Sequence, residues 1–499
     1  MTRDNAIAPA AAPSQAAAWL PEPTRAILEL ALAPTDLRAL PRLPGLERLG
    51  PSRPATLVWH DSADGALARQ HLALVREGRS WRLERLRPGH GEDWPAATPP
   101  PLLDQGSSPA ALRPAPPFDA VPIATLQARR RNYRAHGAEL EVLHGTVRGS
   151  AASRTLCRLR LAGPPFALAE AASALASQLA LSVPRASLAL EAITAAKGAA
   201  APARHLGSPI IPAELSVSEG LALIVGHLLD VLLHWTDRWR HDSEPESVHQ
   251  ARVATRRLRS ALSLYKRAAF CPELESAGAG LRRCASRLGA ARDWDVFLEG
   301  TGARLASLHE GDPRVTSLLR TAQRRRAEAY AELRAYLASA EFRELEIGLG
   351  CAASLRPWEG GAPSGLDRSI KQLASELLDR RLRRVRKDGR GIAALPTPAL
   401  HELRKDCKRL RYAAEFFSDG FPTRETKAFL KRLAFLQEEL GALNDSAVAA
   451  SLTAQLGRAG RGYAGGIVEG WASAGDAQAR KSVRKAWKTF RTAPLFWAG

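Results

Sequence analysis

Two basic segments in the C-terminal half carry side chains suited to binding phosphate groups. The first reads HQARVATRRLR from His249, and the second reads HELRKDCKRLR from His401. Arginine offers a planar fork of N–H donors to phosphate oxygens, and histidine adds a hydrogen bond that strengthens on protonation. The residue types therefore predict anion binding. The candidate residues are His249, Arg252, Arg256, Arg257 and Arg259 in the first segment, and His401, Arg404, Lys408, Arg409 and Arg411 in the second.

The spacing of these residues puts them on one face of a helix. At about 100° per residue, the first, fourth, eighth and eleventh residues of each segment lie within a stripe roughly 80° wide. Leu258 points to the opposite side, and Arg257 and Arg409 flank the stripes. A solvated face usually mixes charges, whereas like charges at these spacings repel by a few tenths of a kcal/mol per pair. Because a bound anion would supply the missing compensation, we interpret the stripes as binding surfaces.

The two segments belong to an internal repeat. His401 follows His249 by 152 positions, and LGAARDWDV (288–296) matches LGALNDSAV (440–448) at the same offset. Two matches in one register indicate a duplicated helical unit, so the two stripes should meet on one shared surface. Asp293 and Asp445 recur as well, and we predict a structural role for them, as helix caps or as partners of a stripe arginine.

Composition limits the classes of protein to consider. The 499 residues carry 71 Lys+Arg and 51 Asp+Glu, a net charge of +20, which favours phosphate-rich partners or an anionic membrane surface. Five cysteines lie far apart without a CxxC pair, which predicts reduced thiols. No His, Cys or carboxylate follows His249 or His401 at three or four positions, so we expect no metal site there.

The apolar segment 221–235 is interrupted by His227, Asp230 and His234. It is predicted to be too short and too polar to cross a bilayer. The Ala/Pro-rich N-terminus lacks the leucine-type core of a signal peptide. We therefore expect a cytoplasmic protein that does not bind membranes.

The pattern of the chain predicts an N-terminal α+β domain followed by an all-α domain. The predicted parts are a tail at 1–22, the α+β domain at 23–195 with a Pro-rich loop at 95–117, a linker at 196–215 and the helical domain at 216–497. Strand-like runs are 57–60, 71–75, 80–87, 139–144 and 155–160, before a helix at 165–179. Helical runs are 218–241, 245–269, 273–288, 292–310, 313–338, 340–355, 366–388, 398–418, 423–442, 444–458, 463–474 and 476–492. A Gly/Pro break at 356–365 separates the first repeat (216–355) from the second (366–497).

At these motifs the sequence resembles the CHAD family, the conserved-histidine α-helical domain. The resemblance covers about 216–497 and includes HQARVATRRLRSAL, HELRKDCKRLRYAAEFF, FLQEELGALNDSAVA and AWKTFRTAPLFW. It implies two pseudo-symmetric four-helix bundles with a basic channel or groove between them, which binds inorganic polyphosphate and is associated with polyphosphate granules. By resemblance, the residues of both segments line that surface, together with Lys405, Arg383, Arg386 and Lys387, and with Arg484, Lys488 and Arg491 on the last helix.

The N-terminal domain resembles a degenerate CYTH domain, the triphosphate tunnel fold. The signature of that family, ExExK, supplies two carboxylates for a divalent metal and a lysine for phosphate. The aligned residues here are Arg25, Ile27 and Glu29, and Ala73 and Val75 replace expected tunnel arginines. Without paired carboxylates, metal-assisted attack on a triphosphate has no metal site.

The sequence thus favours non-catalytic binding of inorganic polyphosphate without a cofactor or metal. One alternative is nonspecific nucleic-acid binding, against which stands the lack of aromatic residues between the stripe cations. The other is residual CYTH-type triphosphatase activity, for which Glu139 and Glu141 are the remaining carboxylates.

Overall fold

The computed structural model describes residues 26–69, 72–85, 120–197, 205–360, 365–421 and 423–498. Of these, residues up to 171 together with 186–197 form one compact unit, and 172–185 together with 205 onward form a second. The predicted tail and the Pro-rich loop lie outside the described residues. Segment 172–185, which the sequence assigns to the N-terminal domain, belongs to the helical unit, because Val183 N donates a hydrogen bond to buried Glu346 and Arg185 pairs with Asp237.

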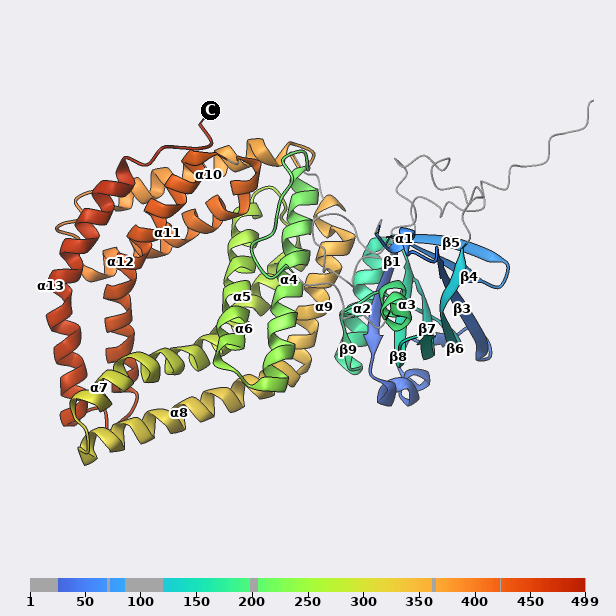
Figure 1. Cartoon of the computed structure of the whole chain (residues 1–499), viewed down its shortest axis with the longest axis horizontal. Coiled ribbons are helices and arrows are strands. Elements are labelled where there is room, and N and C mark those ends of the chain that lie inside the picture. The colour runs from blue at the N-terminus through green and yellow to red at the C-terminus, as the bar shows by residue number, and fades with distance from the viewer. Residues whose placement is uncertain are drawn as a thin grey trace, which may run out of the picture. The chain divides into compact units, whose positions relative to one another are not determined.

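The first unit is built on an antiparallel sheet (Figure 1). Its order is β5-β4-β3-β6-β7-β8-β1, and β2 pairs with β6. The strands are β1 (Ala26–Leu32), β2 (Glu47–Arg48), β3 (Arg53–Asp61), β4 (Leu72–Glu77), β5 (Ser80–Arg85), β6 (Val121–Ala135), β7 (Ala138–Gly149) and β8 (Ser153–Gly163). The five predicted strand runs correspond to β3, β4, β5, β7 and β8. Strand β6 was not predicted because its run of three arginines hides the alternation of buried and exposed residues.

One face of this sheet packs against helix α3 (Leu188–Lys197), which the sequence did not predict. Buried Leu188, Ala192 and Ile193 of the helix lie against Leu57 and Trp59 of the sheet. Helix α2 (Pro165–Gln178), which was predicted, follows β8, and the short strand β9 (Leu181–Ser182) comes after it. The first unit also contains three short helical turns, η2 (Pro34–Arg38), η3 (Leu40–Arg42) and α1 (Ala66–Arg69).

The second unit is helical throughout its longer elements (Figure 1). Its α-helices are α4 (Val217–Asp242), α5 (Pro245–Tyr265), α6 (Pro272–Phe297), α7 (Ala303–Leu308), α8 (Pro313–Ala338), α9 (Ala340–Leu355), α10 (Ile370–Asp388), α11 (Thr397–Phe417), α12 (Arg424–Ala454) and α13 (Tyr463–Arg491). A π-helical turn, η5 (Leu298–Gly302), joins α6 to α7, and the 3₁₀ turns η6 (Pro357–Gly360) and η7 (Ser418–Gly420) follow α9 and α11. The predicted order, a β-rich region and then an all-helical region, is confirmed.

Three predicted helix breaks were wrong. Helices α6, α12 and α13 continue through the gaps predicted near residues 290, 443 and 475. Two of the gaps contain a glycine, Gly289 or Gly475, whose helix propensity is about 1 kcal/mol worse than that of alanine. Tertiary packing of the long apolar faces overrides that local preference. At Gly289 and Gly441 an arginine of the neighbouring helix lies within van der Waals distance of the position that a Cβ would take.

The internal repeat is visible in the helices. Helix α11 begins 152 residues after α5, and α12 begins 152 residues after α6. At the start of α4 and α10, the N-cap residues Ser216 and Ser369 pair with each other in an antiparallel bridge. Val217 N donates to Arg368 O, and Ile370 N donates to Leu215 O, both at 3.0 Å. Reciprocal contacts of this kind indicate a local twofold relation between the repeats.

Helix α4 contains the most apolar segment of the described chain. It has 26 residues and is the one described helix that is long and apolar enough to cross a membrane. The expectation that this segment is too short for a span was wrong, because the helix extends well beyond 221–235. Of its apolar window, 83% is buried inside the protein, where α4 packs against α5 and α9. A helix that is buried to this extent is typical of the core of a folded domain.

Candidate functional site

Helices α5 and α11 carry the two basic stripes and contact each other. Both helices bury a leucine on the side away from the stripe, Leu258 and Leu410, and this burial fixes which residues face outward. Where the helices meet, Arg256 Nε donates a hydrogen bond to Tyr412 Oη, and the guanidinium lies 5.6 Å from the centre of the Tyr412 ring. The tertiary structure therefore joins one stripe to the other.

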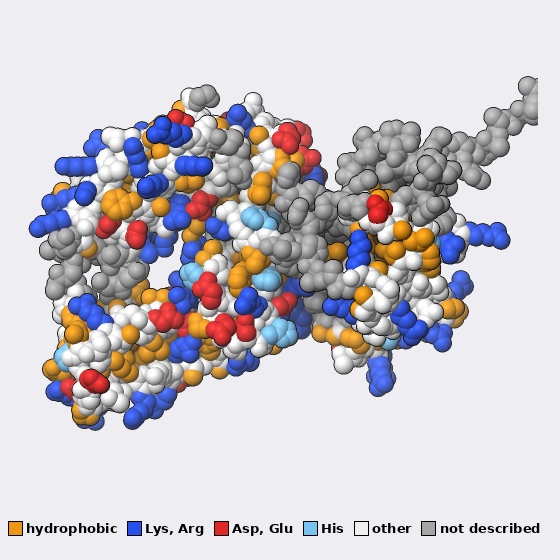
Figure 2. Space-filling view, in the orientation of Figure 1, with side chains coloured by type: hydrophobic (Ala, Val, Ile, Leu, Met, Phe, Trp, Pro, Cys, Tyr) orange, Lys and Arg blue, Asp and Glu red, His pale blue; other side chains and the backbone are white. Residues whose placement is uncertain are grey.

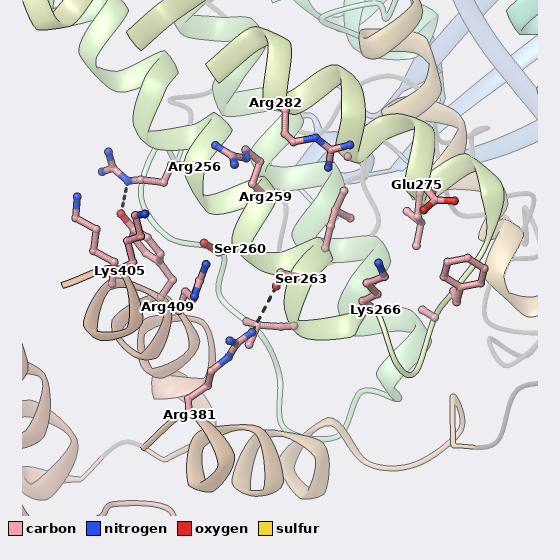
Figure 3. Close-up of a pocket in the computed structure, with 18 of the residues that line it drawn as sticks. Arg256, Arg259, Ser260, Ser263, Lys266, Glu275, Arg282, Arg381, Lys405 and Arg409 are labelled. Atoms are coloured by element: carbon pink, nitrogen blue, oxygen red, sulfur yellow. Dashed lines mark hydrogen bonds between the residues drawn. The ribbon is translucent and has the colours of Figure 1, made fainter. Parts of the chain in front are cut away.

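A first cavity of about 650 Å³ lies on one side of this contact. Figure 3 shows Arg256, Arg259 and Arg282 on α5 and α6 facing Lys405, Arg409 and Arg381 on α11 and α10. Among the described residues that line it, one is a carboxylate, Glu275. Eight are Arg or Lys: Arg256, Arg259, Lys266, Arg282, Arg381, Lys405, Lys408 and Arg409.

The cations of the first cavity repel one another. Burial and the positive charges of Arg282 and Arg409 lower the pKa of Arg259. Burial and the nearby Arg409 also lower the pKa of Arg381. Within the described part of the chain, Arg259 has no ion-pair partner. Arg409 is paired with Asp406 at 2.7 Å, so Arg259 is the guanidinium of this cavity that an entering anion would stabilise most.

A second cavity of about 580 Å³ lies on the other side of the α5–α11 contact. Residues of α6, α12 and α13 also line this cavity. Figure 2 shows an opening through the helical unit with Lys and Arg side chains on its rim. Arg256 and Lys408 line both cavities. The other Arg, Lys and His residues of the described lining are His249, Arg252, Arg292, Arg304 and Arg404.

In the second cavity, equivalent arginines of the two repeats are held in equivalent places. Arg252 Nη1 donates to Asp293 Oδ1 at 2.6 Å and to Gly289 O at 3.2 Å. A Cβ on Gly289 would lie 3.5 Å from Arg252, and a Cβ on Gly441 would lie 3.8 Å from Arg404. The predicted pairing of Asp293 with a stripe arginine is confirmed, whereas the side chain of Asp445 lies outside the described residues.

Comparison with known proteins identifies this helical unit. Residues 223–454 match the family model described as the CHAD domain. The chain contains a CHAD domain. The crystal structure of the CHAD domain from the plant Ricinus communis is 27% identical, with a TM-score of 0.50, and covers 58% of this chain and 98% of its own. The structure of PptA from Streptomyces chartreusis is 18% identical, with a TM-score of 0.41 and coverages of 56% and 99%. No curated protein matches the chain.

The predicted CHAD domain is thus confirmed for residues 223–454, and the antiparallel sheet of the first unit is compatible with a CYTH-like fold. The prediction was that five residues of α5 and six residues of α11 line one surface. Those that line the first or the second cavity are His249, Arg252, Arg256, Arg259, Arg404, Lys405, Lys408 and Arg409.

Other predicted CHAD site residues lie outside these two cavities. Arg257 and Arg411 share Glu415: Arg411 Nε lies 2.6 Å from one carboxylate oxygen and Arg257 Nη2 lies 3.5 Å from the other. This ion pair links α5 to α11, so it supports the crossing of the two helices. His401 is exposed, unlike its half-buried equivalent His249. The residues outside both cavities are Arg257, His401, Arg411, Arg383, Arg386 and Lys387, and on α13 Arg484, Lys488 and Arg491.

On α10, the arginine that lines the first cavity is Arg381, which was not among the predicted site residues. Arg381 lies beside buried Leu382 and donates to Ser263 Oγ of α5 at 3.4 Å. Arg383, Arg386 and Lys387 lie roughly 140–240° further around the helix and are exposed. The helical period of the core residues in α10 was a signal that could have separated the two groups.

Further lining residues were also missed because they come from other helices. Arg282 and Arg292 lie on α6, Arg304 lies on α7 and Trp471 lies on α13. Arg292 stands inside the repeated LGAARDWDV motif, but the second copy has Asn444 at this position, so the repeat did not mark it. Nothing in the local sequence marks Arg304 or Trp471, because tertiary packing brings them to the cavity.

The first unit does not offer the metal site that a CYTH-like fold implies. Glu29, which aligns with the lysine of the family signature, is 2% exposed and lies 3.2 Å from Arg158 and 3.3 Å from Arg160. Glu141 lies 3.3 Å from Arg130. Guanidinium groups beside Glu29 and Glu141 disfavour a divalent cation at either carboxylate. Among the described residues, no three His, Cys, Asp or Glu side chains are grouped as metal ligands.

The half-buried ring of His249 should make polyanion binding depend on pH. Burial, and the positive charges of Arg292, Arg256 and Arg252, lower the pKa of His249, while Glu246 opposes them. The ring is therefore neutral at pH 7, and a bound polyanion, which favours the imidazolium form, raises its pKa. Binding then takes up a proton, so affinity should increase as the pH falls from 8 to 6.

This increase is measured by titrating polyphosphate against the protein at pH 8, 7 and 6. His249→Gln should flatten the pH dependence, and His309→Gln, which changes a histidine outside both cavities, should leave it intact. An unchanged pH dependence in His249→Gln would assign the effect to another group.

Proposed function

We propose that this chain binds inorganic polyphosphate through the two cavities of its CHAD domain and leaves the polymer intact. The CHAD family is associated with polyphosphate, which supports a polyphosphate-related function. The observation that carries the proposal is that cations of both repeats converge on a shared pair, Arg256 and Lys408, with few carboxylates among them.

The arrangement of the cavities suits a linear polymer of phosphates. Because Arg256 and Lys408 belong to both linings, a flexible chain in the first cavity can continue past them into the second. Each successive phosphate then meets cations held on rigid helices, and no bond in the polymer needs to be broken. The uncompensated Arg259 and the half-buried Arg381 are the cations that gain most from the anion.

The absence of catalysis is part of the proposal. Arg25 and Ile27 stand where a CYTH-like reaction needs its metal-binding carboxylates, and the remaining carboxylate Glu141 is already paired with Arg130. We expect no phosphate release from tripolyphosphate in the presence of magnesium or manganese. Release that is lost when Glu141 is changed to Gln would reveal a residual triphosphatase.

Binding is tested by titrating long-chain polyphosphate against the full-length protein at several salt concentrations. Because each neutralised phosphate releases counterions, the logarithm of the affinity should fall linearly with the logarithm of the salt concentration. With about eight cations engaged, a slope of roughly −6 is expected from the behaviour of single-stranded polyanions.

Competition with single-stranded DNA distinguishes a preference for polyphosphate from general binding of nucleic acid. Single-stranded DNA at the same concentration of phosphate groups should displace polyphosphate poorly, because the stripes carry no aromatic residues at which bases could stack in succession. Equal displacement would favour the nucleic-acid alternative, and no measurable binding of polyphosphate would reject the proposal.

We also propose that the protein acts in the cytoplasm, in association with polyphosphate granules. All five cysteines are unpaired and buried, which suits a reducing compartment. Granules present many polymer segments at once, and a site with two joined cavities would be held there by several contacts.

A further inference from the structure

The second cavity is chemically divided. The basic side chains of its lining come from α5 and α11, with Arg292 from α6 and Arg304 from α7. Most of the remaining lining is apolar. The described apolar lining comprises Val296, Phe297, Val448, Ala449, Leu452, Val468 and Trp471, from α6, α12 and α13. Val296 is 46% exposed although it is a large hydrophobic residue. A string of phosphates gains nothing from such a wall, so the wall suits a ligand that joins phosphates to an apolar group.

A planar aromatic surface stands in this apolar part. The guanidinium of Arg304 lies over the indole of Trp471, 4.3 Å from the ring centre. Both side chains line the cavity, and they come from helices α7 and α13. Flat guanidinium and indole groups are the surfaces on which nucleic-acid bases stack. The pair therefore offers a base a stacking partner next to the cationic part.

The backbone is irregular at the same place. The π-helical turn η5 brings Gly300 and Thr301 into the lining, and a Cβ on Gly300 would meet no other atom within 4 Å. Single π-helical turns inside α-helices are frequent at functional sites. Here the turn leaves open space at Gly300, and Thr301 adds a hydroxyl that can donate to or accept from a ligand.

We propose that the second cavity binds a nucleoside polyphosphate, with its phosphates in the basic part and its base against the Arg304–Trp471 pair. The inference rests on the proposed function, because it assigns the same cations to the phosphates. A cavity of about 580 Å³ is of the size that holds such a ligand. The six Arg and Lys residues in the described lining outnumber its one carboxylate, Asp293, which matches the charge of a polyphosphate group.

The test compares ATP with tripolyphosphate by calorimetric titration of the full-length protein at fixed ionic strength and pH without magnesium. Tripolyphosphate has the higher charge density, so electrostatics alone would make it the tighter ligand. Stacking of the base should reverse the order and make ATP bind about tenfold more tightly. Trp471→Leu should remove this preference and leave the affinity for tripolyphosphate unchanged.

Two further variants keep the result interpretable. Trp471→Phe retains an aromatic ring and should retain most of the preference for ATP. Tyr463→Leu is a matched control, because Tyr463 also lies on α13 under an arginine, with Arg314 3.7 Å from its ring centre, but outside both cavities. It should behave like the unchanged protein.

Several outcomes would overturn the inference. They are an ATP affinity no higher than that of tripolyphosphate, an equal loss for both ligands in Trp471→Leu, and a loss in Trp471→Phe as large as in Trp471→Leu. Long-chain polyphosphate is titrated against the same proteins. If polyphosphate binds but ATP shows no preference, the inference alone fails, whereas a lack of polyphosphate binding refutes the proposed function.

Discussion

Changing Arg256 and Lys408 together to glutamine should lower the affinity for long-chain polyphosphate at least about 100-fold at low salt. Hydrogen bonds to a charged group contribute about 1.5–3 kcal/mol each, and 1.4 kcal/mol corresponds to a factor of ten. These two residues are shared by the linings of both cavities. Their loss therefore weakens both cavities and removes the cations at the passage between them.

The control for this variant removes the same charge elsewhere. Arg320 and Arg324 lie exposed on α8, outside both cavities, and changing both to glutamine lowers the net charge by the same amount. This control should lose only a few-fold in affinity, through the weaker overall field. Equal losses in the two variants would show that net charge, and not the α5–α11 site, determines binding. Because Arg256 also contacts Tyr412, thermal unfolding of both variants should be compared.

Changing Glu29 to glutamine should destabilise the first unit by about 3 kcal/mol. Removing one partner from a buried ion pair leaves an uncompensated charge, which typically costs about 3–5 kcal/mol. Arg158 keeps Glu191 at 3.2 Å, so we expect the lower end of that range. The side chains of Glu29, Arg158 and Arg160 are 3%, 8% and 11% exposed, so water screens this network little.

Hydrogen exchange of the β1 and β8 amides in the full-length protein measures this loss. These strands pair antiparallel, with Glu29 opposite Arg160, so their amides report opening of the network. Glu47→Gln is the matched control, because its partner Arg134 is at 3.3 Å but both side chains are more than half exposed. An exposed pair contributes about 0–1 kcal/mol. Equal protection in the two variants would contradict a structural role for Glu29, and polyphosphate binding should be unaffected in both.

The charge network of the first unit extends beyond Glu29. Arg158 contacts Glu191 of α3, and Arg154 contacts the same carboxylate at 2.7 Å. Arg130 lies between Glu77 and Glu141. Carboxylates and guanidinium groups thus alternate across β4, β6, β7, β8 and β1, and each compensates its neighbour. In the two cavities of the helical unit, by contrast, cations gather with few carboxylates, which is why we assign anion binding to the second unit.

Much of the helical fold could be predicted from the sequence, because amphipathic helices record their buried face in a 3.6-residue period. The repeat could also be predicted, because His249 and His401 are separated by the same 152 residues as the motifs at 288–296 and 440–448. The starts of helices α5 and α11 show the same offset. Strand β6 and helix α3 were not readable. Their sequences lack a clear period, and pairing and packing with distant segments form them.

The sequence by itself determined which side chains of α5 and α11 form a basic face, because positions on one helix are fixed by the helical period. Only the tertiary structure decided which of these cations share a cavity. Helix crossing brings Arg256 to Lys408, assigns Arg257 and Arg411 to Glu415, and leaves His401 exposed. Local period carries no information about such contacts, because they depend on how separate helices pack across 150 residues of chain.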